Sequence, residues 1–303
     1  MTTPELITLR HEATYVQVCP AAGGGIVRFW HDDGVRLRDW LRPVRQETIH
    51  PQRGGDMGSY PLVPYCNRIR AGRFSFQGQQ VQLPLNAEPQ PHSLHGHGWQ
   101  AEWQVVTVST GQLTLEYQHQ ADAWPWPYRV RQTFSVGRQR LQIELQLENL
   151  SDSAMPAGLG LHPFFIRTPR SRVYAEIDQI WLTDAEVMPL ELVAPEPARD
   201  PRRGIRVNQV RLDNNYTGWR GLARIQWPEW QAEMTILAEP PLDHLVLFTP
   251  ADKPVVCVEP VSNVTDAVNL TTRSDTGLRS LEPGQMLSAS ACFHYAFIAE
   301  DSK

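Results

Sequence analysis

Apolar and polar residues alternate at every second position over much of this sequence. The alternation is cleanest in residues 141–150, LQIELQLENL, and it recurs in residues 112–120, QLTLEYQHQ. Successive side chains of a β-strand point to opposite faces, so a period of two indicates strands with one buried face. Two apolar runs, residues 244–250 and 254–260, are closed by prolines and predict buried strands.

Helical patterns are weak along the whole chain, because no window of about a dozen residues has strong apolar spacing at three and four. The 25 prolines and 20 glycines are spread along the chain and supply turns between short strands. The sequence therefore predicts an all-β sandwich or barrel rather than alternating strands and helices. A chain of 303 residues could hold two domains, yet residues 195–206, rich in proline and arginine, do not separate two compositionally different halves. We predict one domain over residues 1–303.

Charge and hydropathy argue against several partners. The formal net charge of −5 gives no basic footprint for nucleic acid, and no run of about 18 apolar residues predicts a membrane span. The N-terminus lacks a basic segment followed by an apolar one, so we expect no secretory signal and a cytoplasmic protein. The four cysteines are far apart and form no C-x-x-C pair, which favours reduced thiols over a zinc or redox motif.

Two segments combine polar side chains with glycine or proline. Asn67 and Arg68 lie between a proline-rich apolar stretch and a hairpin-like segment, where a guanidinium group can hold a hydroxyl or carboxylate. In the segment PHSLHGHGW, His95 and His97 flank Gly96. An H-x-H pair suggests a metal site but needs further ligands, and no strong partner motif is present. A polar ligand site and purely structural histidines are the alternatives.

Two further segments carry one titratable residue each beside an apolar run. His162 precedes Pro163, which favours extended backbone and could fix a positioned acid. Glu259 follows the apolar run that begins at residue 255, so we expect a buried carboxyl group with a raised pKa, suited to act as a base near neutral pH. A core histidine and a loop-anchoring glutamate are the structural alternatives.

Taken in order, these segments resemble the aldose 1-epimerases, which are galactose mutarotase-like proteins. The resemblance rests on NRI-x-x-GRF from residue 67, LHG from residue 94, LHPFF from residue 161 and EP from residue 259, and it spans about residue 54 to the C-terminus. Many family members carry LHGG and HPYF, whereas this chain has His97 and Phe164 at the differing positions.

The resemblance implies a large antiparallel β-sandwich, often called a supersandwich, and a hexose whose α and β anomers are interconverted without cofactor or metal. It implies that Glu259 is the catalytic base and His162 the catalytic acid. Ordinary pKa values of about 4.3 and about 6.5 would need only modest shifts toward neutral pH. The implied sugar-binding residues are Asn67, Arg68, His95 and, in the segment LDNNYTGW, Asp213.

Two other functions remain open from the sequence. A hexose-6-phosphate epimerase of the same superfamily would need basic residues at the site rim, for which Arg70 and Arg73 are candidates unless both face solvent. A non-catalytic sugar-binding protein on the same scaffold would have a degraded acid–base pair. In each case the expected partner is a small sugar, and we expect a monomer or weak dimer.

Overall fold

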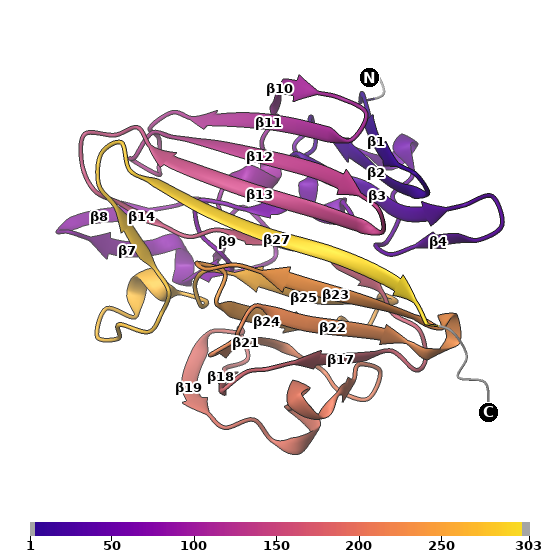
Figure 1. The fold of residues 1–303 in the computed structure, drawn as a ribbon. Helices are drawn as coiled ribbons and strands as arrows, with labels where there is room; N and C mark the ends of the chain where they lie inside the picture. Colours follow the sequence, from indigo (N-terminus) through magenta and orange to yellow (C-terminus); the bar gives the residue numbers. More distant parts are fainter. Residues whose placement is uncertain (1–3, 299–303) are drawn as a thin grey trace.

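Two large antiparallel sheets form the body of the molecule in the computed structural model, which describes residues 4–298 (Figure 1). Within these residues there is no α-helix, and the helical segments are single 3₁₀ turns. The all-β prediction is therefore confirmed. These turns are η1 (Gln46–Thr48), η2 (Gly54–Asp56), η3 (Arg70–Gly72), η4 (Gly98–Gln100), η5 (Pro197–Arg199), η6 (Pro201–Arg203), η7 (Pro228–Trp230) and η8 (Ala267–Asn269).

The larger sheet has nine strands within residues 4–298 and contains the clearest alternating segments. Alternate residues of residues 141–150 are buried, as their pattern predicts. In spatial order its strands are β10 (Gln104–Val108), β11 (Gln112–His119), β12 (Tyr128–Gly137), β13 (Arg140–Asn149), β27 (Met286–Phe297), β23 (Ala232–Ala238), β22 (Leu222–Trp227), β17 (Arg172–Ala175) and β20 (Ile205–Arg206).

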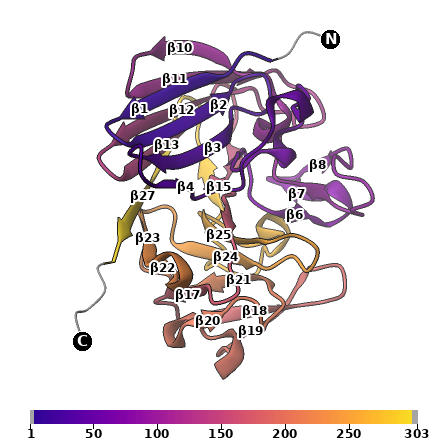
Figure 2. The same cartoon turned by 90° about the vertical axis from the view of Figure 1, so that its right-hand side faces the viewer.

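The second sheet has eight strands within the described residues and contains both of the proline-closed apolar runs. In spatial order its strands are β19 (Pro189–Val193), β18 (Gln179–Thr183), β21 (Asp213–Thr217), β24 (His244–Phe248), β25 (Val255–Val261), β15 (Gly160–Leu161) and β5 (Pro61–Leu62), with β16 (Phe164–Ile166) also paired to β25. The two views show this sheet behind β22 and β23 of the larger one (Figures 1 and 2).

Four small sheets complete the fold. The four-stranded one packs its inner face, including Val16 and Phe29, against the same core as the large sheets. They consist of β1 (Ile7–His11), β2 (Thr14–Cys19), β3 (Gly25–Asp32) and β4 (Leu37–Asp39); of β6 (Arg68–Ile69) with β9 (Ser93–Leu94); of β7 (Arg73–Phe76) with β8 (Gln79–Gln82); and of β14 (Met155–Ala157) with β26 (Arg279–Leu281).

One contiguous apolar core joins both large sheets, and we call it the main core. Phe134 and Ile143 enter it from the larger sheet, and Leu245 and Val258 enter it from the second sheet. Burial of such side chains removes roughly 25 cal/mol of unfavourable hydration free energy per Å² of apolar surface. Within residues 4–298 the main core thus spans both large sheets, and one domain over residues 1–303 stays a prediction.

Candidate functional site

Glu259 lies on a strand that is buried on both faces. Val256 and Val258 of β25 enter the main core, so by alternation Cys257 and Glu259 point to the opposite face. Glu259 is only 2% exposed there. A second apolar cluster covers this face, and we call it the site-side cluster: Tyr60, Leu62, Cys66, Phe164, Val246, Val255, Cys257 and Val261.

Strand register places Asp213 on the same face of the sheet as Glu259. Glu259 is the Cα partner of Val246 on β24, and Val246 is the partner of Asn215 on β21. Asp213 lies two residues before Asn215, so its side chain is on the same face and one row away. The aspartate that the resemblance implied is therefore brought to this face by the sheet itself.

His162 sits in the connection between β15 and β16, both of which pair with β25. Its backbone N–H donates to the carbonyl oxygen of Tyr60 at 3.0 Å. Pro163 follows it, which favours the extended backbone seen on both sides. These contacts place Nε2 of His162 3.4 Å from Oε1 of Glu259.

The LHG and NRI segments hold each other through the short pair β6 and β9. His95 N–H donates to the Asn67 carbonyl at 2.9 Å, and Asn67 N–H lies 3.1 Å from Nδ1 of His95. Because Nδ1 accepts this bond, the ring proton of neutral His95 is on Nε2, which can donate to a ligand. Gly96 follows with a φ of 71°, and a Cβ there would lie 2.1 Å from the Val63 carbonyl oxygen, so only glycine fits.

Arg68 connects the remaining predicted residues. Its Nη1 donates to Oδ1 of Asn67 at 2.9 Å, and its Nη2 donates to Oδ2 of Asp213 at 3.1 Å. The rings of His95 and His162 lie 5.2 Å apart. All six site residues predicted from the sequence thus form one connected group, which runs Glu259, His162, His95, Asn67, Arg68, Asp213.

Aromatic rings surround the two histidines, and the sequence did not single them out. Tyr60 lies 4.8 Å from the ring of His162, and Phe164 stacks on it at 4.5 Å with an interplanar angle of 14°. Trp99 lies 5.8 Å from Tyr60 and 6.5 Å from His95. The only sequence signals were the aromatic residues beside each histidine motif, in HPFF and HGHGW.

Arg42 is another residue of this site that the sequence did not reveal. Its guanidinium lies 3.8 Å above the ring of Phe164, on a stack that continues to His162. It donates hydrogen bonds to the backbone carbonyls of Gly55 and Met57, at distances of 2.7 to 3.1 Å. A part-buried cation without a carboxylate hydrogen-bond partner therefore stands behind the candidate acid.

Burial governs the electrostatics of Glu259 and His162, the candidate acid–base pair. It raises the pKa of Glu259 well above its ordinary value; the charge of Asp213 adds to this, and Arg68 opposes it. Burial also lowers the pKa of His162 to about 3, and the Arg42 and Arg68 charges act in the same direction. The expected rise for Glu259 is confirmed. The expectation that His162 needs only a modest shift toward neutral pH is wrong, because the ring is desolvated and faces cations.

His97 does not join this group. Its Nδ1 lies 3.0 Å from the Tyr128 hydroxyl, and its ring stacks on His119 at 4.4 Å with an interplanar angle of 6°. Ligand atoms of His97, His119 and Asp122 lie within 4.8 Å of one another. However, the lone pairs of parallel stacked rings run side by side rather than converging, which suits a tetrahedral metal poorly. The contacts of His97 favour the structural reading.

The two arginines considered for a phosphate differ in their surroundings. Arg70 lies 3.8 Å from Asp184 and 3.8 Å from Asp266, so carboxylates already compensate its charge. Arg73 is exposed and donates to Gln82 at 2.6 Å. Neither arrangement offers an unpaired cation aimed at Glu259 and His162.

Comparisons with known proteins agree with the fold and the motifs. The family model described as aldose 1-epimerase matches residues 5–293. The uncharacterised protein YphB of Escherichia coli K12 is 32% identical over 295 residues, which cover 92% of this chain and 95% of that protein. A solved structure from Escherichia coli K12, described as a candidate aldose 1-epimerase, is 29% identical with a TM-score of 0.87 and covers 97% and 99% of the two chains. A galactose mutarotase-like protein of Clostridium acetobutylicum is 18% identical, with a TM-score of 0.84 and coverage of 97% and 96%, and shows the fold alone.

Proposed function

Because the chain belongs to the aldose 1-epimerase family, we propose that it interconverts the α and β anomers of a free hexose. The observation that carries the proposal is the buried contact of 3.4 Å between His162 and Glu259. Ring opening of a hemiacetal needs a base at the C1 hydroxyl and an acid at the ring oxygen. Both oxygens are bonded to C1, so the acid and the base must stand close together.

In the proposed reaction, protons pass between the sugar and both Glu259 and His162. Glu259 takes the proton of the C1 hydroxyl while His162 protonates the ring oxygen, and the C1–O5 bond breaks. Rotation about C1–C2 presents the other face of the carbonyl. His162 then removes the proton from the C5 hydroxyl as it attacks C1, and Glu259 returns a proton to the carbonyl oxygen. No redox step occurs, and the pair ends in its starting state.

The pKa directions fit a pair that holds a single transferable proton. A raised pKa of Glu259 and a lowered pKa of His162 both favour uncharged groups, a carboxylic acid beside a neutral imidazole. Moving that proton to His162 gives the form that begins ring opening, and the chemical step returns it to Glu259. Coupled groups of this kind titrate as a unit.

The remaining site residues have roles set by their hydrogen bonds. Arg68 can polarise a sugar oxygen and stabilise the Glu259 carboxylate when it forms, because guanidinium bonds to charged acceptors are the stronger kind. The Nε2–H of His95 can donate to a hydroxyl, and Asp213 can accept one. The side-chain oxygen of Asn67 already accepts hydrogen bonds from the backbone N–H and the guanidinium of Arg68. Its role is therefore to position Arg68 and His95.

A hexose-6-phosphate epimerase and a non-catalytic binder are less well supported alternatives. The charge of Arg70 is already compensated by Asp184 and Asp266. A non-catalytic binder has no need for a carboxyl group buried beside an imidazole, an arrangement that costs folding stability and is typical of catalytic sites. Within residues 4–298 no helix is long and apolar enough to span a membrane.

The direct experiment follows freshly dissolved α-D-glucose and α-D-galactose by polarimetry or proton NMR, with and without the protein. We expect faster relaxation to the anomeric equilibrium with at least one of them. If neither relaxes faster and glucose 6-phosphate does, the phosphorylated substrate replaces the free hexose. If none of the three relaxes faster, the proposed activity is wrong.

As the pH is lowered, kcat/KM should not show the fall that the protonation of an ordinary histidine would cause. The pair keeps one proton between the pKa of His162, at about 3, and the raised pKa of Glu259. We therefore expect that kcat/KM, corrected for the spontaneous rate, does not fall as the pH is lowered to about 5. An acid limb with a midpoint near 6.5 would mean that His162 titrates as a free imidazole, against this assignment.

Replacing Arg68 by lysine should weaken substrate binding more than it slows the chemical step. Lysine keeps the charge but cannot donate to Asn67 and Asp213 at once, as the planar guanidinium does. We expect KM to rise about tenfold, the loss of one charge-assisted hydrogen bond. Steady-state kinetics with whichever hexose the protein relaxes faster measure KM and kcat of the variant. Arg70→Lys is the matched control, and an equal rise of KM in both variants would place Arg68 outside the binding site.

A further inference from the structure

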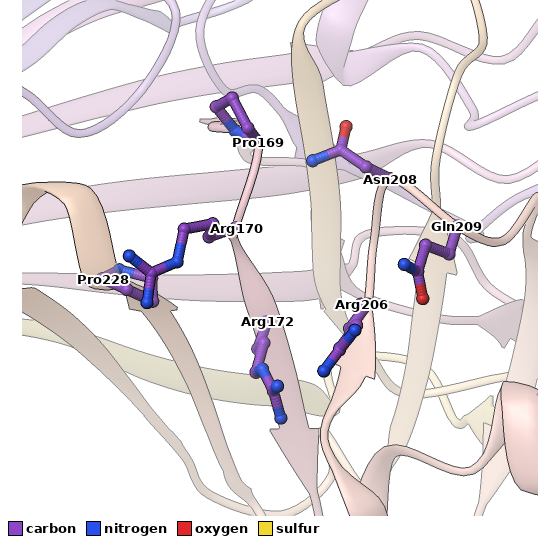
Figure 3. A pocket seen from close by; sticks show the side chains of 7 residues that line it. All are labelled: Pro169, Arg170, Arg172, Arg206, Asn208, Gln209 and Pro228. Atoms are coloured by element: carbon purple, nitrogen blue, oxygen red, sulfur yellow. The ribbon is translucent and has the colours of Figure 1, made fainter.

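A hollow lined by three arginines lies at the free edge of the nine-stranded sheet (Figure 3). Its volume is about 260 Å³, and it contains none of the site residues described above. Figure 3 shows Arg172 and Arg206 on neighbouring strands with their side chains extended in the same direction, and Arg170 turned toward Pro228. The lining residues are Pro169, Arg170, Arg172, Arg206, Asn208, Gln209 and Pro228.

Strand register forces two of these arginines together. Arg172 of β17 and Arg206 of β20 are direct Cα partners, so their side chains leave the same face of the sheet. The neighbouring pair, Val173 and Ile205, is buried in the main core. Alternation therefore fixes both arginines on the outer face. Like charges directly opposite each other on adjacent strands are destabilising.

The same outer row contains a carboxylate, but it is engaged elsewhere. Arg172 is also the partner of Gln226 on β22, and Gln226 is the partner of Glu233 on β23. Glu233 accepts a hydrogen bond from Gln226 at 2.8 Å and lies 3.9 Å from Arg224. Gln226 thus stands between the carboxylate and Arg172, and the positive end of the row stays uncompensated.

Among residues 4–298, no carboxylate lies within ion-pair distance of the guanidinium groups of Arg170, Arg172 or Arg206. Glu229 lies near Arg170, but it accepts from the Thr168 hydroxyl at 2.8 Å and from the backbone N–H of Arg170 at 2.6 Å. The charge of Arg170 also interacts with Glu229. In a chain with a net charge of −5, the cations of this hollow that no carboxylate compensates are therefore Arg172 and Arg206.

We propose that the hollow between β17, β20 and η7 binds the phosphate or sulfate group of a small molecule. Two guanidinium groups from facing positions present several donors to one tetrahedral oxyanion, the geometry for which arginine forks are suited. The ligand's charge also relieves the repulsion between Arg172 and Arg206. The volume of the hollow, about 260 Å³, is several times the roughly 30 Å³ that one water molecule occupies in the liquid. The hollow therefore has room for a small organic group attached to the oxyanion.

Calorimetric titration with inorganic phosphate and with glycerol 3-phosphate tests this site without any sugar substrate. Sodium chloride keeps ionic strength constant, because exposed charges are screened by salt. We expect saturable binding of both probes. Arg172→Gln and Arg206→Gln should each weaken it about tenfold or more, the loss of one charge-assisted contact. Arg172→Lys should fall between the wild type and Arg172→Gln.

Arg220→Gln is the matched control, since it removes the same charge from an exposed arginine that lies 4.0 Å from Asp178. It should change the affinity by less than about twofold. Phosphate should also raise the melting temperature of the wild type but not of Arg172→Gln, because a ligand stabilises only the state that binds it. No saturable binding of either probe, or equal weakening by Arg220→Gln, would overturn the proposal, whereas the activity of the hexose site is unaffected by either result.

Discussion

Replacing Glu259 by glutamine is expected to lower kcat about 10²–10⁴-fold, which corresponds to about 3–5 kcal/mol of activation free energy. Glutamine has nearly the same shape but cannot accept the proton of the C1 hydroxyl. KM should change much less, because the side chain acts on the reacting atoms and Arg68, His95 and Asp213 remain. Polarimetry at saturating hexose gives kcat, and initial rates over a range of concentrations give KM.

The same variant should not be destabilised at neutral pH. Burial raises the pKa of Glu259, so between the unfolded and the folded pKa the native state holds a proton that the unfolded chain has released. The wild type therefore loses stability as pH rises through that window, and Glu259→Gln does not. We expect the melting temperature of the variant, relative to wild type, to increase from pH 5 to pH 8. Near-normal activity of Glu259→Gln, with the exposed Glu239→Gln as control, would refute the role of Glu259 as base.

Replacing His162 by glutamine is expected to lower kcat about 10²–10⁴-fold as well. An amide can donate a hydrogen bond to the ring oxygen but cannot transfer a proton to it. The glutamine side chain still packs beside Tyr60 and Phe164, so the fold should persist, and circular dichroism checks this. The exposed His50→Gln is the control for loss of an imidazole.

A second variant separates proton transfer from packing. His162→Ala leaves a space beside the rings of Tyr60 and Phe164 that imidazole from solution can enter. We expect added imidazole to restore part of the rate in His162→Ala, beyond its catalysis of the protein-free reaction, and to have no such effect on Glu259→Gln. Full activity in either His162 variant would contradict its role as acid.

The sequence predicted the strands well where one physical pattern decides the structure. Residues 141–150 alternate because one face of β13 is buried, and residues 254–260 do not alternate because β25 is buried on both faces. The six site residues also come together as the motifs implied. However, the role of Asp213 came from the resemblance, because its proximity to Glu259 depends on the register of β21 and β24, which no local pattern encodes.

What the sequence could not reveal depends on contacts between distant segments. Arg42 lies 122 positions before Phe164, and its hydrogen-bond partners are backbone carbonyls, which leave no trace in residue types. The direction of the pKa shift of His162 depends on that same cation and on burial. His97 could not be separated from His95 by spacing alone, since only the structure shows that it turns to His119 and Tyr128.

The burial of β25 on both faces bears on how the substrate preference of such a protein can be altered. Its Val256 and Val258 side chains are held by the main core, while Cys257 and Glu259 face the site-side cluster. The proposed catalytic carboxyl group of Glu259 is thus held by a strand anchored in the main core, whereas Asn67, Arg68 and His95 come from short segments that bond mainly to one another. If the proposed function holds, replacing these segments should change substrate preference, while a cavity made behind β25, as in Val258→Ala, should impair every substrate alike.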